Sequence, residues 1–182
     1  MTDSDAAPAE HTRTGRSRPV LATVLAVLCV LAVAGAVALG VWLRGATVER
    51  EQRERDRLEV MRAAERFTIT WNTFSADDAQ GYVDRVAKLL TPEFRAEFNG
   101  ARENVVAGIV QQRLSSTGKV LVDDDGIPLV GIASLDDDSA DVLVVADARR
   151  VASGQRVLRH WRWEVSLRQV DGTWLVDSFK EV

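Results

Sequence analysis

The amino-acid sequence predicts an α+β domain that is preceded by one transmembrane helix. Residues 20–43 carry no charge, apolar residues recur at helical spacing between Leu58 and Ile109, and patterns typical of strands fill residues 119–182. Helices followed by strands are typical of α+β domains whose sheet is mostly antiparallel. We therefore expect three helices to cover the apolar face of such a sheet.

The apolar run is long enough to cross a membrane. Residues 20–43 number 24 and include no proline. A helix of this length extends about 36 Å, whereas the hydrocarbon core of a bilayer is about 30 Å thick. Trp42 and Arg44 stand where interfacial anchors are expected. The alternative is a cleaved signal peptide with residues 13–18 as its charged region, but such peptides have apolar parts of only about 7–15 residues.

The regions on either side of this run are polar. Residues 1–19 have no apolar periodicity, and we expect a disordered tail. Arginines lie on both sides of the run, so the positive-inside rule does not settle its direction. Long domains cross membranes largely regardless of their charge. We therefore expect a cytoplasmic tail and an extracytoplasmic domain at the cell membrane.

A charged segment leads into the domain. Within residues 44–57, Glu49 with Arg53 and Glu51 with Arg55 stand at the favourable i,i+4 spacing. We expect a charged helical stalk here, with a solvated linker as the alternative. Residues 58–182 are then enough for a single domain.

Three helices are expected in the first half of this domain. The first presents an apolar face of Leu58, Met61, Ala64, Phe67, Trp71 and Phe74. Ser75 is a candidate N-cap of the second helix, because Asp77 and Asp78 follow in its first turn. Thr91 and Pro92 predict the start of the third helix, in which Asn99-Gly100 is a candidate break.

Strands are expected over residues 119–123, 127–135, 141–149, 157–170 and 173–182. Asp171-Gly172 is a strong hairpin signal that pairs Val170 with Thr173. Alternation then places on one covered face Trp161, Trp163, Val165, Leu167, Trp174 and Val176. The solvent-facing side would carry Leu158, His160, Arg162, Glu164, Ser166, Arg168, Asp177 and Phe179.

Charge and cysteine content restrict the function classes. The chain has 23 Lys and Arg against 27 Asp and Glu, a net charge of −4, and lacks the basic balance expected for nucleic-acid binding. Its single cysteine, Cys29, lies in the apolar run and allows no intrachain disulfide. The sequence has no Gly-rich phosphate loop, CxxC pair or Gly-x-Ser-x-Gly motif. We therefore predict no cofactor and no metal.

Acid–base chemistry has one candidate. His160 is the only histidine after the apolar run, but alternation puts it on the solvent-facing side. Asp147 interrupts a valine-rich strand, and the two alternatives are an aspartate that points inward and an aspartate at an edge or strand end, of which the second is the commoner case. The acidic segment Asp123–Gly126 is expected to be a hairpin turn, because position twelve of a calcium loop begun at Asp123 would be Ser134 and not Glu. We therefore predict no catalytic residues.

The aromatic residues leave two interpretations open. Large aromatics that face a concave sheet line a ligand pocket in some proteins and fill the core in others. The candidate lining of an apolar pocket suited to a lipid chain is Trp71, Phe74, Tyr82, Trp161, Trp163 and Trp174.

Four segments carry a family resemblance. They are residues 89–94 (LLTPEF), 116–120 (STGKV), 140–145 (ADVLVV) and 170–176 (VDGTWLV). With them, the whole chain resembles the actinobacterial Mce-associated membrane proteins. The order of helices and strands resembles the nuclear transport factor 2-like cone, which is shared with SnoaL-like proteins. The matching motifs are core and turn residues, so no catalytic residue is carried over.

The resemblance implies a cone-shaped domain on a single-pass anchor. The implied function is that of a non-enzymatic accessory subunit of an Mce lipid- or sterol-import complex, with protein partners and, as a further option, lipid. Tethered cone proteins of type IV secretion systems have a similar layout, so a scaffold of a secretion or envelope assembly is the second hypothesis. A membrane-tethered, SnoaL-like small-molecule-binding enzyme is the third.

Overall fold

The computed structural model describes residues 52–152 and 154–182. The expected tail, the expected transmembrane helix over residues 20–43 and residues 44–51 of the expected stalk lie outside this range. Between residues 52 and 182, no described helix is both long enough and apolar enough to cross a bilayer.

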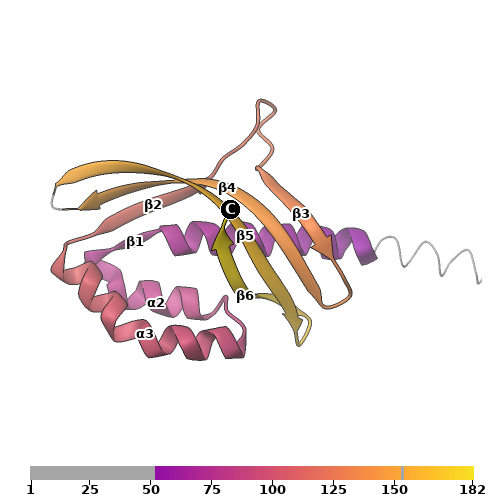
Figure 1. Ribbon diagram of the computed structural model, residues 1–182, viewed down its shortest axis with the longest axis horizontal. Coiled ribbons are helices and arrows are strands. Elements are labelled where there is room, and N and C mark those ends of the chain that lie inside the picture. The colour runs from indigo at the N-terminus through magenta and orange to yellow at the C-terminus, as the bar shows by residue number, and fades with distance from the viewer. Residues whose placement is uncertain (1–51, 153) are drawn as a thin grey trace, which may run out of the picture. The chain divides into compact units, whose positions relative to one another are not determined.

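Three helices pack on a curled antiparallel sheet (Figure 1), which confirms the predicted α+β class. The first helix covers residues 52–72. The later elements are β1 (Phe74–Ser75), a 3-10 turn (Ala76–Asp78), α2 (Ala79–Ala87), α3 (Pro92–Gln111), β2 (Ser115–Val120), β3 (Val130–Leu135), β4 (Ser139–Ala152), β5 (Gln155–Val170) and β6 (Thr173–Glu181).

The long strand β4 organises the sheet. Its second half pairs with β2 and its first half with β3, so these two strands share one edge of β4. On the other edge β5 pairs with β4 from Gln155 to Arg168, and β6 pairs with the later half of β5. The far halves of β4 and β5 therefore extend beyond β6 as an arm, which carries β2 and β1 on its other edge (Figure 1).

The predicted N-cap of the second helix at Ser75 is wrong. Ser75 lies in β1 before the 3-10 turn and its side chain forms no cap hydrogen bond, and α2 begins only at Ala79, after Asp78.

The third helix begins where the sequence predicts. The Thr91 hydroxyl accepts a hydrogen bond from the Phe94 amide at 3.3 Å, and Pro92 opens α3, which confirms the predicted cap. The predicted break at Asn99-Gly100 is wrong, because α3 is continuous from Pro92 to Gln111. Both residues are exposed, and buried Phe98 and Ile109 hold the helix on either side of them.

The β2–β3 connection is longer than expected. The strand predicted over residues 119–123 lies earlier in the chain, since β2 runs from Ser115 to Val120, and the strand predicted over residues 127–135 is shortened, since β3 begins at Val130. The Asp123 carboxylate accepts hydrogen bonds from the amides of Asp125 and Ile127, at 3.0 and 2.8 Å. These bonds hold a local turn in place of a longer ladder.

One face assignment in the final hairpin is wrong. Asp171 and Gly172 both have positive φ, 49° and 74°, and the predicted register of Leu167 with Val176 is confirmed. A bulge next to this pair then shifts the register, so that Val165 lies opposite Phe179. One extra residue reverses the side on which every later side chain lies. Phe179 therefore lies on the inner face, although plain alternation placed it outside.

The core lies between the helices and the inner face of the sheet. From the first helix it takes Val60, Ala63, Ala64 and Phe67, whereas Leu58, expected on the buried face, is 40% exposed. The sheet contributes Ala140, Val142, Val144, Ala146, Ala148, Trp163, Val165, Leu167, Trp174 and Val176. These last five residues match the predicted covered face of β5 and β6.

Gly118 permits a close approach of β2 to the first helix. A Cβ atom at this position would lie 2.4 Å from the Cβ of Asn72, which is fully buried. Gly118→Ala should therefore lower the free energy of unfolding by about 1–3 kcal/mol, through overpacking against the helix end. The measurement is urea denaturation. Gly131→Ala is the matched control, because a Cβ there meets nothing within 4 Å; an equal loss in both variants would contradict the explanation.

Candidate functional site

The inner face of the sheet carries an aromatic cluster composed of Phe67, Trp71, Phe94, Phe98, Trp163 and Phe179. Phe179 lies at its centre, with ring centroids 4.8 Å from Trp71, 5.1 Å from Phe67 and 5.2 Å from Trp163. Such tilted and edge-on contacts stabilise a core beyond the area that they bury.

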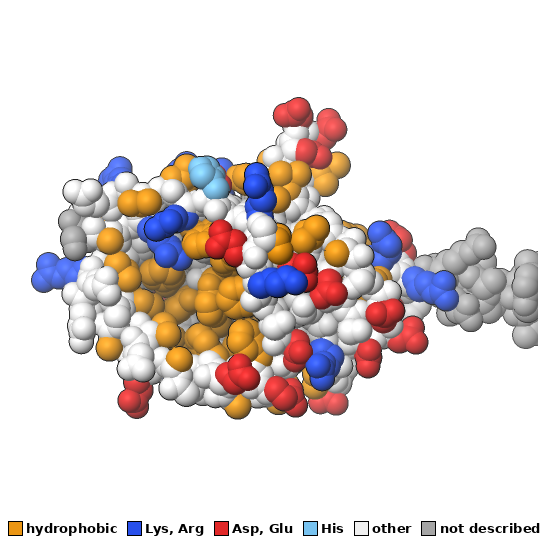
Figure 2. Space-filling model, viewed as in Figure 1, with side chains coloured by type: hydrophobic (Ala, Val, Ile, Leu, Met, Phe, Trp, Pro, Cys, Tyr) orange, Lys and Arg blue, Asp and Glu red, His pale blue; other side chains and the backbone are white. Residues whose placement is uncertain are grey.

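The six candidate pocket residues fall into separate groups. Trp71 and Trp163 belong to the aromatic cluster, and Trp161 contacts Trp163 at 5.5 Å. Phe74 and Tyr82 form a second pair at 5.3 Å. Trp174 is buried on β6. Figure 2 shows hydrophobic side chains gathered in a hollow between the helices and the sheet.

Arg150 lies at the inner face of the arm, between the Phe74–Tyr82 pair and Trp161. Its guanidinium carbon lies 5.4 Å from the centre of the Trp161 ring and 5.9 Å from that of Phe74, within cation–π range. On β2, Ser116 lies directly opposite Arg150, and on β1 Phe74 lies opposite Ser116. These residues, together with Tyr82, are called the Arg150 cluster below.

Two titratable groups of the Arg150 cluster have pKa values that are shifted from their ordinary values. Burial raises the pKa of Tyr82 to about 12, against the opposing effect of the Arg150 cation. Burial also lowers the pKa of Arg150, and the neighbouring Arg159 cation acts in the same direction. Between residues 52 and 182, apart from residue 153, no carboxylate forms an ion pair with Arg150.

Sequence reasoning did not single out Arg150, although a signal was present. Buried residues occupy every second position of β4 from Ala140 to Ala148. The same alternation places Arg150 next on that inner face. An arginine beside another arginine near a hairpin end is more often a solvated charge than part of a buried site.

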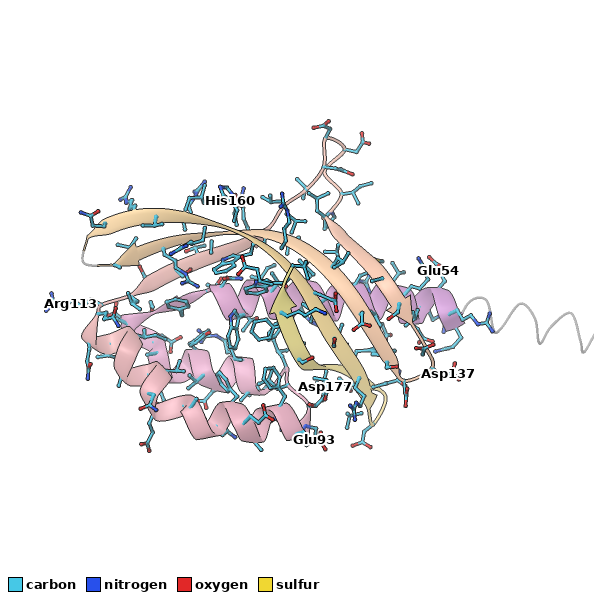
Figure 3. The ribbon with its side chains drawn as sticks, in the orientation of Figure 1. Glu54, Glu93, Arg113, Asp137, His160 and Asp177 are labelled. Carbon is cyan, nitrogen blue, oxygen red and sulfur yellow. The ribbon has the colours of Figure 1, made fainter. Side chains whose placement is uncertain are left out.

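His160 and Asp147 meet on the outer side of the sheet. His160 Nδ1 lies 2.7 Å from Asp147 Oδ1, with the histidine side chain 73% exposed and the aspartate 13% exposed. Figure 3 shows His160 on the side of the sheet away from the helices. The predicted outward position of His160 is confirmed. Its pairing with Asp147, a mid-strand residue of β4 and not one at a strand end, was not foreseen.

The connection between β2 and β3 projects from the domain (Figure 1). We call residues 121–130 the projecting hairpin. Val122, Ile127 and Leu129 within it are 54%, 59% and 38% exposed. Its tip is the acidic turn that begins at Asp123, and Figure 2 shows acidic side chains at the end of this projection. None of the described parts of the chain brings together three His, Cys, Asp or Glu side chains that could hold a metal.

Solved structures share this fold. The periplasmic domain of DotI has a TM-score of 0.55 at 13% identity, over 68% of this chain and 92% of that one. An IcmL-like type IV secretion system protein from Legionella pneumophila has a TM-score of 0.56 at 10% identity, over 69% and 91%. CagV from Helicobacter pylori, a homologue of VirB8, has a TM-score of 0.52 at 6% identity, over 69% and 97%.

Sequence comparison gives the family. No protein with a curated description matches the chain. The family model described as "Uncharacterized protein Rv1363c/MT1408-like" matches residues 18–180. This match extends over most of the sequence, so the chain belongs to the Rv1363c/MT1408-like family.

Proposed function

We propose that the chain is a non-enzymatic, membrane-anchored accessory subunit of an Mce-type lipid- or sterol-import complex. In this proposal its extracytoplasmic domain acts by contacts with protein partners, and the projecting hairpin is the main contact. The observation that carries the proposal is the exposure of Val122, Ile127 and Leu129 on an element that stands away from the core.

The hairpin has the composition of a contact site. When a partner covers apolar side chains that are half exposed, the complex is stabilised by about 25 cal/mol for each Å² of apolar surface that is buried. The acidic tip adds a charge pattern that favours one docking orientation and a basic partner surface. The turn is held by the Asp123 hydrogen bonds, so less conformational entropy is lost on binding.

The choice of an Mce-type complex rests on the resemblance of the whole chain to Mce-associated membrane proteins. The family match also begins before the apolar run, at residue 18, as expected if anchor and domain act together. A single-pass anchor would raise the effective concentration of the domain for partners in the same membrane.

A scaffold of a secretion or envelope assembly is the second candidate. It is favoured by the fold shared with the IcmL-like type IV secretion system protein and with CagV. A tethered enzyme is favoured only by the His160–Asp147 pair. That pair lies on the side of the sheet opposite the aromatic cluster, and therefore outside the apolar pocket that the candidate aromatic residues would line.

Crosslinking in native membranes tests the proposal. The full-length chain should co-purify with membrane subunits of a lipid importer. Ile127→Ser should reduce their recovery at least about tenfold, because one large apolar contact contributes roughly 1.5–3 kcal/mol and about 1.4 kcal/mol is already a factor of ten. Val110→Ser is the matched control, since Val110 is 47% exposed on α3. Recovery of secretion components instead would favour the scaffold, and recovery of neither class would contradict both functions.

A further inference from the structure

We propose that the Arg150 cluster binds the oxyanion head, a carboxylate or a phosphate, of an amphiphilic ligand. The proposal deepens the proposed function, and the choice of a lipid as the source of this head rests on that function. The site itself rests on the geometry of Phe74, Tyr82, Ser116, Arg150 and Trp161.

The cluster contains buried polar atoms that lack a partner. Arg150 Nε, Trp161 Nε1 and Ser116 Oγ are buried and form no hydrogen bond with any residue that the structure describes. Ser116 is only 4% exposed. The arginine and the indole nitrogens can only donate, and a hydroxyl can donate as well. Buried donors normally have partners, so a group that only accepts is the expected complement.

The charge of the cluster favours an anion. Arg150 has no carboxylate partner in the described parts of the chain, and Arg159 is close enough to act on it electrostatically. Of the five arginines between residues 148 and 163, Arg150 and Arg159 share this inner face, because Arg159 pairs with the buried Ala148 in the β4–β5 ladder. A guanidinium binds carboxylates and phosphates through paired hydrogen bonds, which are shorter and stronger than neutral ones.

The arrangement also provides an apolar surface beside the charge. Phe74, Ser116, Arg150 and Val157 are directly opposed residues on four neighbouring strands, β1, β2, β4 and β5. Directly opposed side chains have Cβ atoms about 4.5–5.5 Å apart. Trp161 then continues through Trp163 into the aromatic cluster. An oxyanion at Arg150 would therefore have aromatic rings beside it for an attached apolar chain.

A titration of the full-length chain in phosphatidylcholine nanodiscs tests the site, with empty nanodiscs subtracted. Decanoate, decanol and inorganic phosphate are each added, and tryptophan fluorescence reports binding. Decanoate should bind at least about tenfold more tightly than the other two, a difference of about 1.4 kcal/mol. Arg150→Gln should weaken decanoate binding by a similar factor. Arg149→Gln should leave it unchanged, because this exposed neighbour lies on the other face.

Thermal unfolding of each variant shows whether it is folded. If Arg150→Gln is unfolded, Trp161→Phe replaces it, since this change keeps a ring and removes the indole donor; it should weaken decanoate binding several-fold. Equal binding of decanol would overturn the oxyanion site, as would intact binding in a folded Arg150→Gln or Trp161→Phe variant. Equal binding of phosphate would overturn the lipid source, because the anion alone would then suffice.

The outcome can be separated from that of the proposed function. Decanoate binding without recovery of importer subunits would support the site and contradict the accessory-subunit function. Recovery of those subunits by a chain that does not bind decanoate would support the accessory-subunit function and overturn the Arg150 site.

Discussion

Trp163→Ala is expected to lower the free energy of unfolding by about 3–5 kcal/mol. Trp163 is 4% exposed, and its ring contacts both Trp161 and Phe179. Alanine would remove a large apolar surface from the core and leave a cavity between the sheet and the helices, which relaxes only in part. Chemical denaturation followed by circular dichroism measures the change.

His160→Ala is the control on the same strand. Its side chain is mostly exposed on the outer face, and the expected loss is under about 1 kcal/mol even with the Asp147 contact removed. Large and equal losses in the two variants would mean that the two faces of β5 are assigned the wrong way round.

Local patterns account for the parts of the fold that the sequence predicts. The turn at Asp171-Gly172 needs two residues that tolerate positive φ, and both are adjacent in the chain. Thr91 caps α3 through an amide only three residues away. The alternation of Trp163, Val165 and Leu167 requires only that one side of a strand be buried. Signals of this kind do not depend on distant contacts.

The features that sequence reasoning missed depend on contacts across the fold. Arg150 lies in the candidate site because β1, β2 and β5 place Phe74, Ser116 and Trp161 around it. His160 meets Asp147 because the register of β4 with β5 makes them directly opposed. A one-dimensional pattern shows which side of a strand is covered, but it does not show which residue of another strand lies opposite.

The β6 bulge is the most informative case. Asp177 is the residue that this bulge adds, since its neighbours Val176 and Ser178 pair with Leu167 and Ser166 while Asp177 pairs with neither. Its carboxylate accepts a hydrogen bond from the Thr91 hydroxyl at 3.0 Å and one from Arg168 at 3.1 Å. The bulge is thus held by the cap of α3, which is 86 residues away in sequence. No pattern within β6 itself indicates this partner.

Phe179→Ala is therefore expected to lower the free energy of unfolding by about 3 kcal/mol, because Phe179 contacts four other rings. Ser178→Ala, one residue earlier and exposed, should change it by less than about 0.5 kcal/mol. Plain alternation without the bulge would put Ser178 inside and Phe179 outside, and would reverse this order. Equilibrium denaturation of the two variants thus measures the register of β6 directly: a larger loss for Ser178→Ala would show that the bulge, and with it the central place of Phe179 in the aromatic cluster, is wrong.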